Sequence, residues 1–150
     1  MKLVVQRVKQ AVLTINDELT AKINQGLLVL VGIAPEDNDK TIEWITNKIV
    51  NLRVFNDENG KLNKSVLDIP NGGLLIVSNF TIYGDCRKGF RPSYSDAALP
   101  EPAKQTFDNL VKYIKDKWSD KLLIQNGIFG ADMQINLTND GPVTLIVEKN

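Results

Sequence analysis

Leu27-Leu28-Val29-Leu30-Val31-Gly32-Ile33 is an unbroken apolar stretch, and the interpretation of the fold starts from it. A run of this length suits a β-strand, and a strand that is apolar at every position is one that is buried on both faces. We therefore expect this strand to lie at the centre of a sheet.

The segments before this strand have strand patterns, and the next segment after it has a helix pattern. Upstream, the valine-rich segment Lys2–Val8 predicts a strand, and Ala11–Ile15 and Leu19–Ile23 flank the polar turn Asn16-Asp17-Glu18 as in a hairpin. Downstream, apolar residues recur at three- and four-residue spacing, which indicates a helix with Asp39 as its N-cap and its end near Arg53. The residues of that stripe are Ile42, Ile45, Ile49 and Leu52.

The second half of the chain predicts another strand, another helix and three closing strands. Asn71-Gly72-Gly73 is a turn signal just before the apolar strand Leu74–Val77, and Glu101–Trp118 carries an apolar stripe at helical spacing. The closing strands are Leu122–Gln125, Met133–Leu137 and Val143–Val147. The expected fold is α+β, with largely antiparallel sheets forming a barrel-like core, two main helices and a single domain over residues 1–150.

Composition excludes several kinds of chemistry. The 150 residues include no histidine, the side chain that serves most often as general base, so Ser-His-Asp and Cys-His mechanisms are excluded. Lys plus Arg equals Asp plus Glu at 18 each, so a nucleic-acid partner must be met by a local basic patch. Cys86 is the one cysteine, which favours a reduced thiol in the cytoplasm. No membrane span, targeting segment, metal site or cofactor motif is expected.

Two polar segments are the candidates for chemistry. Ser78-Asn79-Phe80-Thr81 ends the strand Leu74–Val77, and Asn139-Asp140-Gly141-Pro142-Val143-Thr144 leads into the last strand. Each also has a purely structural interpretation, because hydroxyls at a strand end bond to nearby backbone groups and Asn-Asp-Gly-Pro favours a turn.

A third candidate is the loop Gly84-Asp85-Cys86-Arg87-Lys88-Gly89-Phe90-Arg91-Pro92-Ser93-Tyr94. Its three cations are interleaved with two aromatic rings, a pattern that can contact phosphates and stack on a base. A solvated loop is the alternative. Without a histidine to activate its thiol, Cys86 is not expected to be a nucleophile.

These segments also occur together, in order and at a characteristic spacing. The set is Val5-Gln6-Arg7-Val8, the Ser78 segment, Asp85–Gly89 with Arg91-Pro92-Ser93, Gly127-Ile128-Phe129-Gly130-Ala131-Asp132-Met133, and Asn139–Thr144. With it the chain resembles, from end to end, the D-aminoacyl-tRNA deacylases, also called D-tyrosyl-tRNA deacylases. In the family's first motif a glutamine stands where this chain has Asn79, which keeps the amide but is shorter by one methylene.

The resemblance implies a homodimer without a cofactor that hydrolyses D-aminoacyl-tRNA to free tRNA and D-amino acid, and also removes glycine mischarged on tRNA(Ala). It implies that the Gly141-Pro142 peptide is cis and enters the partner subunit's site, where its carbonyls receive the substrate's ammonium group. The site residues that it implies are Ser78, Phe80 and Thr81 for catalysis, Arg7, Asn79, Met133, Gly141 and Pro142 for substrate binding, and Arg87, Lys88 and Arg91 for tRNA.

Two mechanisms fit an activated aminoacyl ester. Either the Thr81 hydroxyl attacks, or water attacks while the adenosine 2′-hydroxyl assists proton transfer. We favour water, because the motif offers no base for Thr81, and we expect backbone N–H groups near Phe80 and Thr81 to stabilise the oxyanion. A non-catalytic protein that binds tRNA 3′ ends and a small-metabolite hydrolase on the same scaffold are the competing functions.

Overall fold

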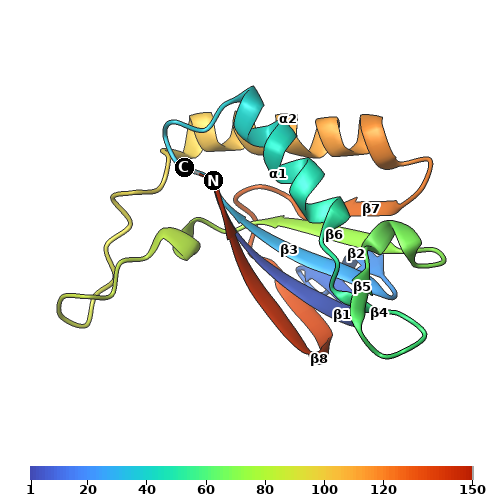
Figure 1. Cartoon of the computed structure of the whole chain (residues 1–150). Helices are drawn as coiled ribbons and strands as arrows, with labels where there is room; N and C mark the ends of the chain where they lie inside the picture. Colours follow the sequence, from blue (N-terminus) through green and yellow to red (C-terminus); the bar gives the residue numbers. More distant parts are fainter. Residues whose placement is uncertain (150) are drawn as a thin grey trace.

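The computed structural model describes residues 1–149, in which two helices lie over one face of a curved sheet (Figure 1). The helices are α1 (Asp39–Asn51) and α2 (Pro100–Trp118), and the short 3-10 helices are η1 (Val66–Asp68) and η2 (Phe80–Tyr83). The main sheet consists of β1 (Lys2–Ile15), β2 (Glu18–Ile23), β3 (Gly26–Gly32), β6 (Gly73–Ser78), β7 (Leu123–Asn126) and β8 (Gln134–Glu148). A small hairpin is formed by β4 (Phe55–Asn56) and β5 (Leu62–Lys64).

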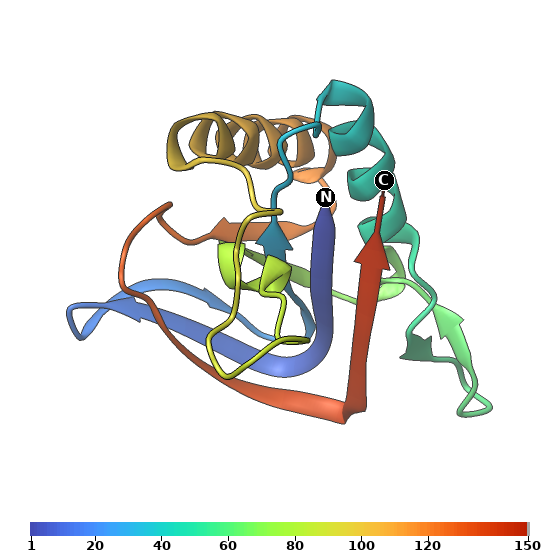
Figure 2. The ribbon, with the colours of Figure 1, turned by 90° about the vertical axis from the view of Figure 1, so that its left-hand side faces the viewer.

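The strand order is β2-β1-β3-β6-β7, with β8 paired to the other edge of β1. The pairs that β1 makes are antiparallel, whereas β3–β6 and β6–β7 are parallel. A parallel pair needs a long crossover connection, and α1 and α2 lie in those two connections. The sheet curls until β2 lies against β6 and β7 (Figure 2). The expected α+β class with a barrel-like core and two helices is confirmed, and the two parallel pairs are an addition to it.

Both faces of β3 are buried, as its apolar sequence predicts. Leu27, Val29 and Val31 pack in the cluster beneath the helices, and Leu28 packs in a second cluster inside the curl of the sheet. A strand covered on both faces has little room for polar side chains. The end of this strand therefore contributes an apolar wall to the neighbouring site.

The helix starts differ from the predicted ones by one residue each. The side chain of Asn38, not Asp39, caps α1 by accepting hydrogen bonds from the N–H groups of Lys40 and Thr41. Asn38 has the extended backbone that a cap requires, and Thr41 completes a capping box. At α2, Pro100 occupies the first turn, where its missing N–H costs no hydrogen bond.

The prediction of separate strands 133–137 and 143–147 is wrong, because they are parts of one strand, β8, that follows β1 along its length. Val8 pairs with Asn139 and Gln6 pairs with Thr144, so the single residue Arg7 faces the four-residue segment 140–143. That excess makes β8 turn a corner, visible as its sharp bend in Figure 2. The expected turn is thus a projecting corner within a strand.

The hairpin between β1 and β2 is confirmed. Ile15 pairs with Glu18, and Asn16 and Asp17 between them have positive φ angles of 51° and 63°. A two-residue loop with that backbone matches the twist of the flanking strands, and Asn and Asp tolerate it. Among the helices of residues 1–149, none is both long and apolar enough to cross a membrane.

Candidate active site

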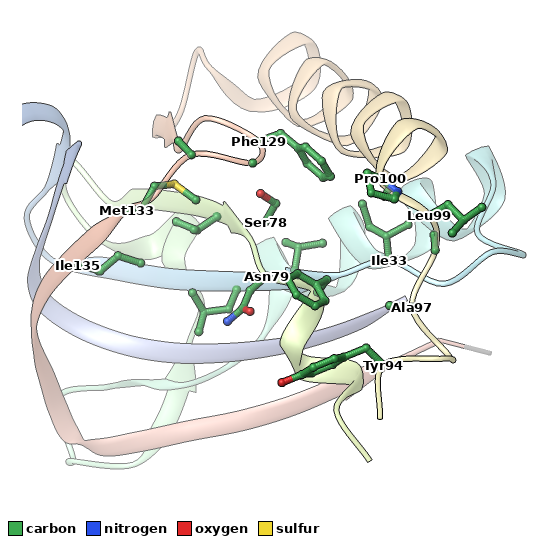
Figure 3. A pocket seen from close by; sticks show the side chains of 18 residues that line it. Ile33, Ser78, Asn79, Tyr94, Ala97, Leu99, Pro100, Phe129, Met133 and Ile135 are labelled. Carbon is green, nitrogen blue, oxygen red and sulfur yellow. The ribbon is translucent and has the colours of Figure 1, made fainter. Parts of the chain in front are cut away.

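A cavity of about 670 Å³ opens beside the carboxyl ends of β3 and β6, within the size range of small-molecule sites. Its walls come from β3, the Ser78 segment, the segment that leads into α2, and the segment 129–135. In Figure 3, Ser78 and Phe129 point into the same space from opposite sides, with Asn79 next to Ser78. Apart from Ser78, Asn79 and Tyr94, the side chains of the lining are apolar, as is usual in small-molecule sites.

The structure brings four of the predicted site residues to this cavity: Ser78, Asn79, Phe80 and Met133. Ser78 is the last residue of β6 and pairs with Val31 of β3, and the N–H of Asn79 donates to the carbonyl of Val31 at 2.8 Å. These bonds hold the Ser78 segment on the sheet. Ser78 thus both ends a strand and lies in the cavity wall.

Asn79 organises the turn that follows. Its Oδ1 accepts hydrogen bonds from the backbone N–H of Thr81, at 3.2 Å, and from the Thr81 hydroxyl, and so caps η2. This contact bears on two possible roles of Thr81, that of a nucleophile and that of an oxyanion donor. The Thr81 hydroxyl points at an amide oxygen, which cannot take its proton as a base, and the Thr81 N–H is already used.

The Phe80 N–H is the remaining candidate for an oxyanion donor. It has no hydrogen-bond partner among residues 1–149, whereas the N–H groups of Asn79, Thr81 and Ile82 do. Thr81 itself does not line the cavity but lies one residue beyond its wall. Of the two backbone N–H groups near which we expected oxyanion stabilisation, only that of Phe80 is free within residues 1–149.

Other cavity residues were not predicted from the sequence as site residues. Tyr94 contacts Phe80 edge to face, with ring centroids 5.0 Å apart, and Phe129 packs against Phe107 of α2. Leu99 and Pro100 complete the wall at the start of α2. Tyr94 and Phe129 lie in loops, where no periodicity marks a side chain as inward-facing, although they belong to the segments 84–94 and 127–133 that the sequence singles out.

The segment 127–133 is held in place by contacts at its base. A Cβ at Gly127 would lie 2.5 Å from the sulfur of Met133, so a larger residue there would displace the Met133 side chain. The amide of Asn126 donates to the carbonyl of Gly127 at 2.9 Å and its oxygen accepts from Lys115 of α2 at 2.6 Å. Met133 is thus positioned by its surroundings rather than by a regular element.

Arg7 holds the corner of β8. Its buried guanidinium donates from Nη1 to the carbonyl of Val54 at 2.6 Å and from Nε to the carbonyl of Asp140 at 3.0 Å, with the Asp140 carboxylate 3.4 Å away. Asn139 closes the base of the corner, because its side chain exchanges two hydrogen bonds of 3.1 Å with the backbone of Val143. The corner is thus fixed from both sides.

The Gly141-Pro142 peptide bond at the tip of the corner is cis, and both residues are exposed. Gly141 has φ 127°, and a Cβ on it would lie 2.8 Å from Nη2 of Arg7. Neither residue lines the cavity of the same chain, and neither does Arg7. The predicted site residues therefore form two groups, at the cavity and at the corner.

The predicted tRNA-binding cations form a third group, in the exposed loop after η2. Arg87 donates to both carboxylate oxygens of Asp85 at 2.8 Å, and this guanidinium lowers the pKa of Asp85 to about 2. Lys88 and Arg91 form no ion pair with any carboxylate within residues 1–149. Two of the three cations are accordingly available to a ligand. Across the same residues, no cluster of three metal-ligating side chains occurs.

Comparison with known proteins shows the family to which the chain belongs. The family model described as D-Tyr-tRNA(Tyr) deacylase matches residues 4–148. The D-aminoacyl-tRNA deacylases of Petrotoga mobilis and Thermosipho africanus are each 51% identical over 148 residues, which is 99% of this chain and 97% of theirs.

Two solved structures share the fold. A c-Myc DNA unwinding element binding protein superposes with a TM-score of 0.92 at 40% identity, covering 100% of this chain and 99% of the other. A probable eukaryotic D-amino acid tRNA deacylase superposes with a TM-score of 0.81, covering 97% of each chain, but at 14% identity it supports the fold alone.

The chain therefore belongs to the D-Tyr-tRNA(Tyr) deacylase family. The expectation of an enzyme of the D-aminoacyl-tRNA deacylase class, a carboxylic ester hydrolase, is confirmed by this membership.

Proposed function

We propose that the protein hydrolyses the ester that joins a D-amino acid to the terminal adenosine of tRNA, in the cytoplasm and as a homodimer. The observation that carries the proposal is the largely apolar cavity beside Ser78 and the Phe80 N–H, since it offers an apolar surface for the adenosine and a backbone donor near the ester. Family membership supports the reaction class.

In the proposed reaction a water oxygen attacks the ester carbonyl carbon and the Phe80 N–H donates to the developing oxyanion. The bond between that carbon and the ribose oxygen then breaks, the amino acid leaves as its carboxylate after one of the two protons of the water passes to solvent, and the ribose oxygen takes the other proton. The adenosine 2′-hydroxyl relays this proton, because neither histidine nor another base lies in the cavity wall.

The hydrogen bond from Thr81 to Asn79 argues against the acyl-enzyme route. A nucleophilic hydroxyl needs a base that accepts its proton, and an amide oxygen is not one. We assign Thr81 a positioning role, in which it and Asn79 hold the turn that presents the Phe80 N–H. Asn79, although shorter than the glutamine of the family motif, makes this contact within its own turn.

We assign selection for the D form to the corner of a second subunit. No carboxylate lines the cavity to receive the substrate's ammonium group, whereas the exposed corner presents main-chain carbonyls at a site fixed by Arg7. A rigid main chain close to Cα would exclude an L side chain and accept its mirror image. Glycine has no side chain to exclude, so we expect glycine mischarged on tRNA(Ala) to be hydrolysed as well.

The test is hydrolysis of glycyl-tRNA(Ala), D-Tyr-tRNA and L-Tyr-tRNA by the purified protein, with ester loss measured against time. Release of D-tyrosine and glycine but not L-tyrosine supports the proposal. Tight binding of D-Tyr-tRNA without ester loss would instead identify a non-catalytic binder of tRNA ends, and hydrolysis of simple esters alone would identify a small-metabolite hydrolase.

A further inference from the structure

The tip of the loop after η2 carries an aromatic ring that contacts no other part of the protein. Phe90 is 106% exposed relative to a reference residue, and Gly89 beside it has φ 66°, which turns the chain at the tip. Lys88 and Arg91 flank the ring, and neither forms an ion pair within residues 1–149. An exposed ring between two unpaired cations is the arrangement found where proteins bind single-stranded nucleic acid.

The loop is tied to the rim of the cavity at both ends. The backbones of Asp85 and Ser93 exchange hydrogen bonds of 2.8 and 3.0 Å, and just beyond them Tyr94 contacts Phe80 of the cavity wall. From this base the loop projects away from the sheet and the helices, on the left in Figure 1 and toward the viewer in Figure 2.

The reach of the tip follows from chain length. Phe90 lies three residues from Ser93, and three residues of extended chain span at most about 10 Å. The ring therefore stays within this distance of Ser93, next to the rim of the cavity, where the nucleotides that precede a terminal adenosine in the cavity would emerge.

We propose that Phe90 stacks on a base of the single-stranded 3′ end that precedes the terminal adenosine of tRNA, with Lys88 and Arg91 on the flanking phosphates. This inference rests on the function proposed above and specifies which part of the tRNA the loop binds. Arg87 is not included, because Asp85 already occupies its guanidinium.

Binding of RNA tests the inference without any hydrolysis. The probe is a short fluorescent single-stranded RNA with the sequence of a tRNA 3′ end, titrated against wild type, Phe90→Ala, Phe90→Leu and Phe90→Trp. Stacking of one base corresponds to about a fivefold to 150-fold change in affinity. Phe90→Ala and Phe90→Leu should weaken binding by that range, whereas Phe90→Trp should retain it. Leu19→Ala, at another exposed apolar residue, is the control and should change nothing.

Equal binding by Phe90→Leu and wild type would overturn the inference, since leucine keeps apolar surface but cannot stack. It would also be overturned if the RNA affinity of Phe90→Ala were unchanged while its binding to phosphatidylserine vesicles were lost, because the tip would then be a membrane contact.

Kinetics separate this inference from the proposed function. With D-Tyr-tRNA, Phe90→Ala should raise KM within the same range and leave kcat unchanged, and with D-tyrosyl-adenosine, which lacks the preceding nucleotides, it should match wild type. If wild type hydrolyses neither ester but RNA binding depends on the ring, the proposed function fails and the inference stands. If wild type hydrolyses both and Phe90→Ala has no effect on either, only the inference fails.

Discussion

The contact between Thr81 and Asn79 decides which of two mechanisms the site can support. The Thr81 hydroxyl lies outside the cavity wall and donates to an amide oxygen. A side chain held this way orders its turn and does not attack an ester. Thr81→Val should therefore lower kcat by no more than about tenfold, because only a supporting hydrogen bond is lost.

Thr81→Ser, which keeps the hydroxyl, is the matched control and should behave as wild type. Single-turnover assays with D-Tyr-tRNA measure the chemical step directly. A loss of several thousandfold for Thr81→Val, or an acyl adduct on Thr81 detected by mass spectrometry, would contradict the water mechanism.

The ion pair between Asp85 and Arg87 leads to a prediction about the pKa of Asp85. The pKa of Asp85 is lowered to about 2 by the hydrogen bonds from Arg87, so the carboxylate is charged and paired above its ordinary pKa of 3.8, and the pairing is lost as pH falls through about 2. Between pH 5 and 9 the pair should not titrate. In Arg87→Gln the pKa should rise toward the ordinary value, as measured from the carboxyl carbon shift of Asp85 by NMR. An Asp85 pKa near 3.8 in wild type would contradict the pairing.

Gly141 is the residue at which the corner tolerates no side chain. Its φ of 127° disfavours any other residue, and a Cβ would meet Nη2 of Arg7 at 2.8 Å. We expect Gly141→Ala to lower stability by about 1–3 kcal/mol, from the backbone term and the displaced guanidinium together. Hydrolysis of D-Tyr-tRNA should fall by more than stability alone explains.

Gly60→Ala separates the two causes, because Gly60 also has a positive φ, of 76°, but nothing within 4 Å of the added Cβ. Gly60→Ala should lower stability only through its unfavourable backbone conformation, and it should leave hydrolysis unchanged. Urea denaturation gives the two stabilities, and equal losses in both proteins would mean that the contact with Arg7 adds nothing.

At the scale of elements, the corner of β8 depends on one buried cation. Arg7 satisfies carbonyls from two separate segments, those of Val54 and Asp140. Arg7→Met would keep most of the side-chain volume but leave these carbonyls without their donor, and a buried unsatisfied group costs about 1–3 kcal/mol. We expect a loss of about 2–4 kcal/mol by urea denaturation.

Arg53→Met is the matched control, because Arg53 also donates to a backbone carbonyl, that of Asn63, but on the protein surface. It should change stability by less than about 0.5 kcal/mol. If the two substitutions cost the same, Arg7 does not hold the corner.

The elements show which features can be predicted from sequence and why. The apolar run at β3, the stripes of α1 and α2, and the β1–β2 hairpin follow from local periodicity and turn residues. The two parallel strand pairs and the single bent strand β8 depend on which segments meet in space, and no local pattern carries that information. For the same reason the segments 78–81, 84–94, 127–133 and 139–144 could be selected from the sequence, but not the fact that Tyr94 and Phe129 line one cavity with Ser78.

At the scale of the whole molecule, the corner of β8 does not line the cavity of its own chain. We expect the working unit to be a symmetric dimer in which the corner of each subunit completes the cavity of the other. Mixing two inactive variants tests this idea: Gly141→Ala, altered at the corner, and Ser78→Leu, with a larger side chain in the cavity.

After subunit exchange, half of the dimers should be mixed, and each mixed dimer has one site that lacks both substitutions. Activity should then return to about a quarter of the wild-type value by statistical mixing. If each chain used its own corner, every site would carry a substitution and the mixture would stay inactive. Circular dichroism of both variants confirms that they are folded before mixing.

The central claim is that a site with no histidine hydrolyses aminoacyl esters of tRNA and selects their configuration through main-chain contacts. The most direct measurement is the rate of ester loss from D-Tyr-tRNA and L-Tyr-tRNA, incubated in parallel with the wild-type protein. We predict rapid loss of the D ester and little loss of the L ester beyond its spontaneous hydrolysis. Equal rates on the two esters, or no hydrolysis of either, would contradict the account.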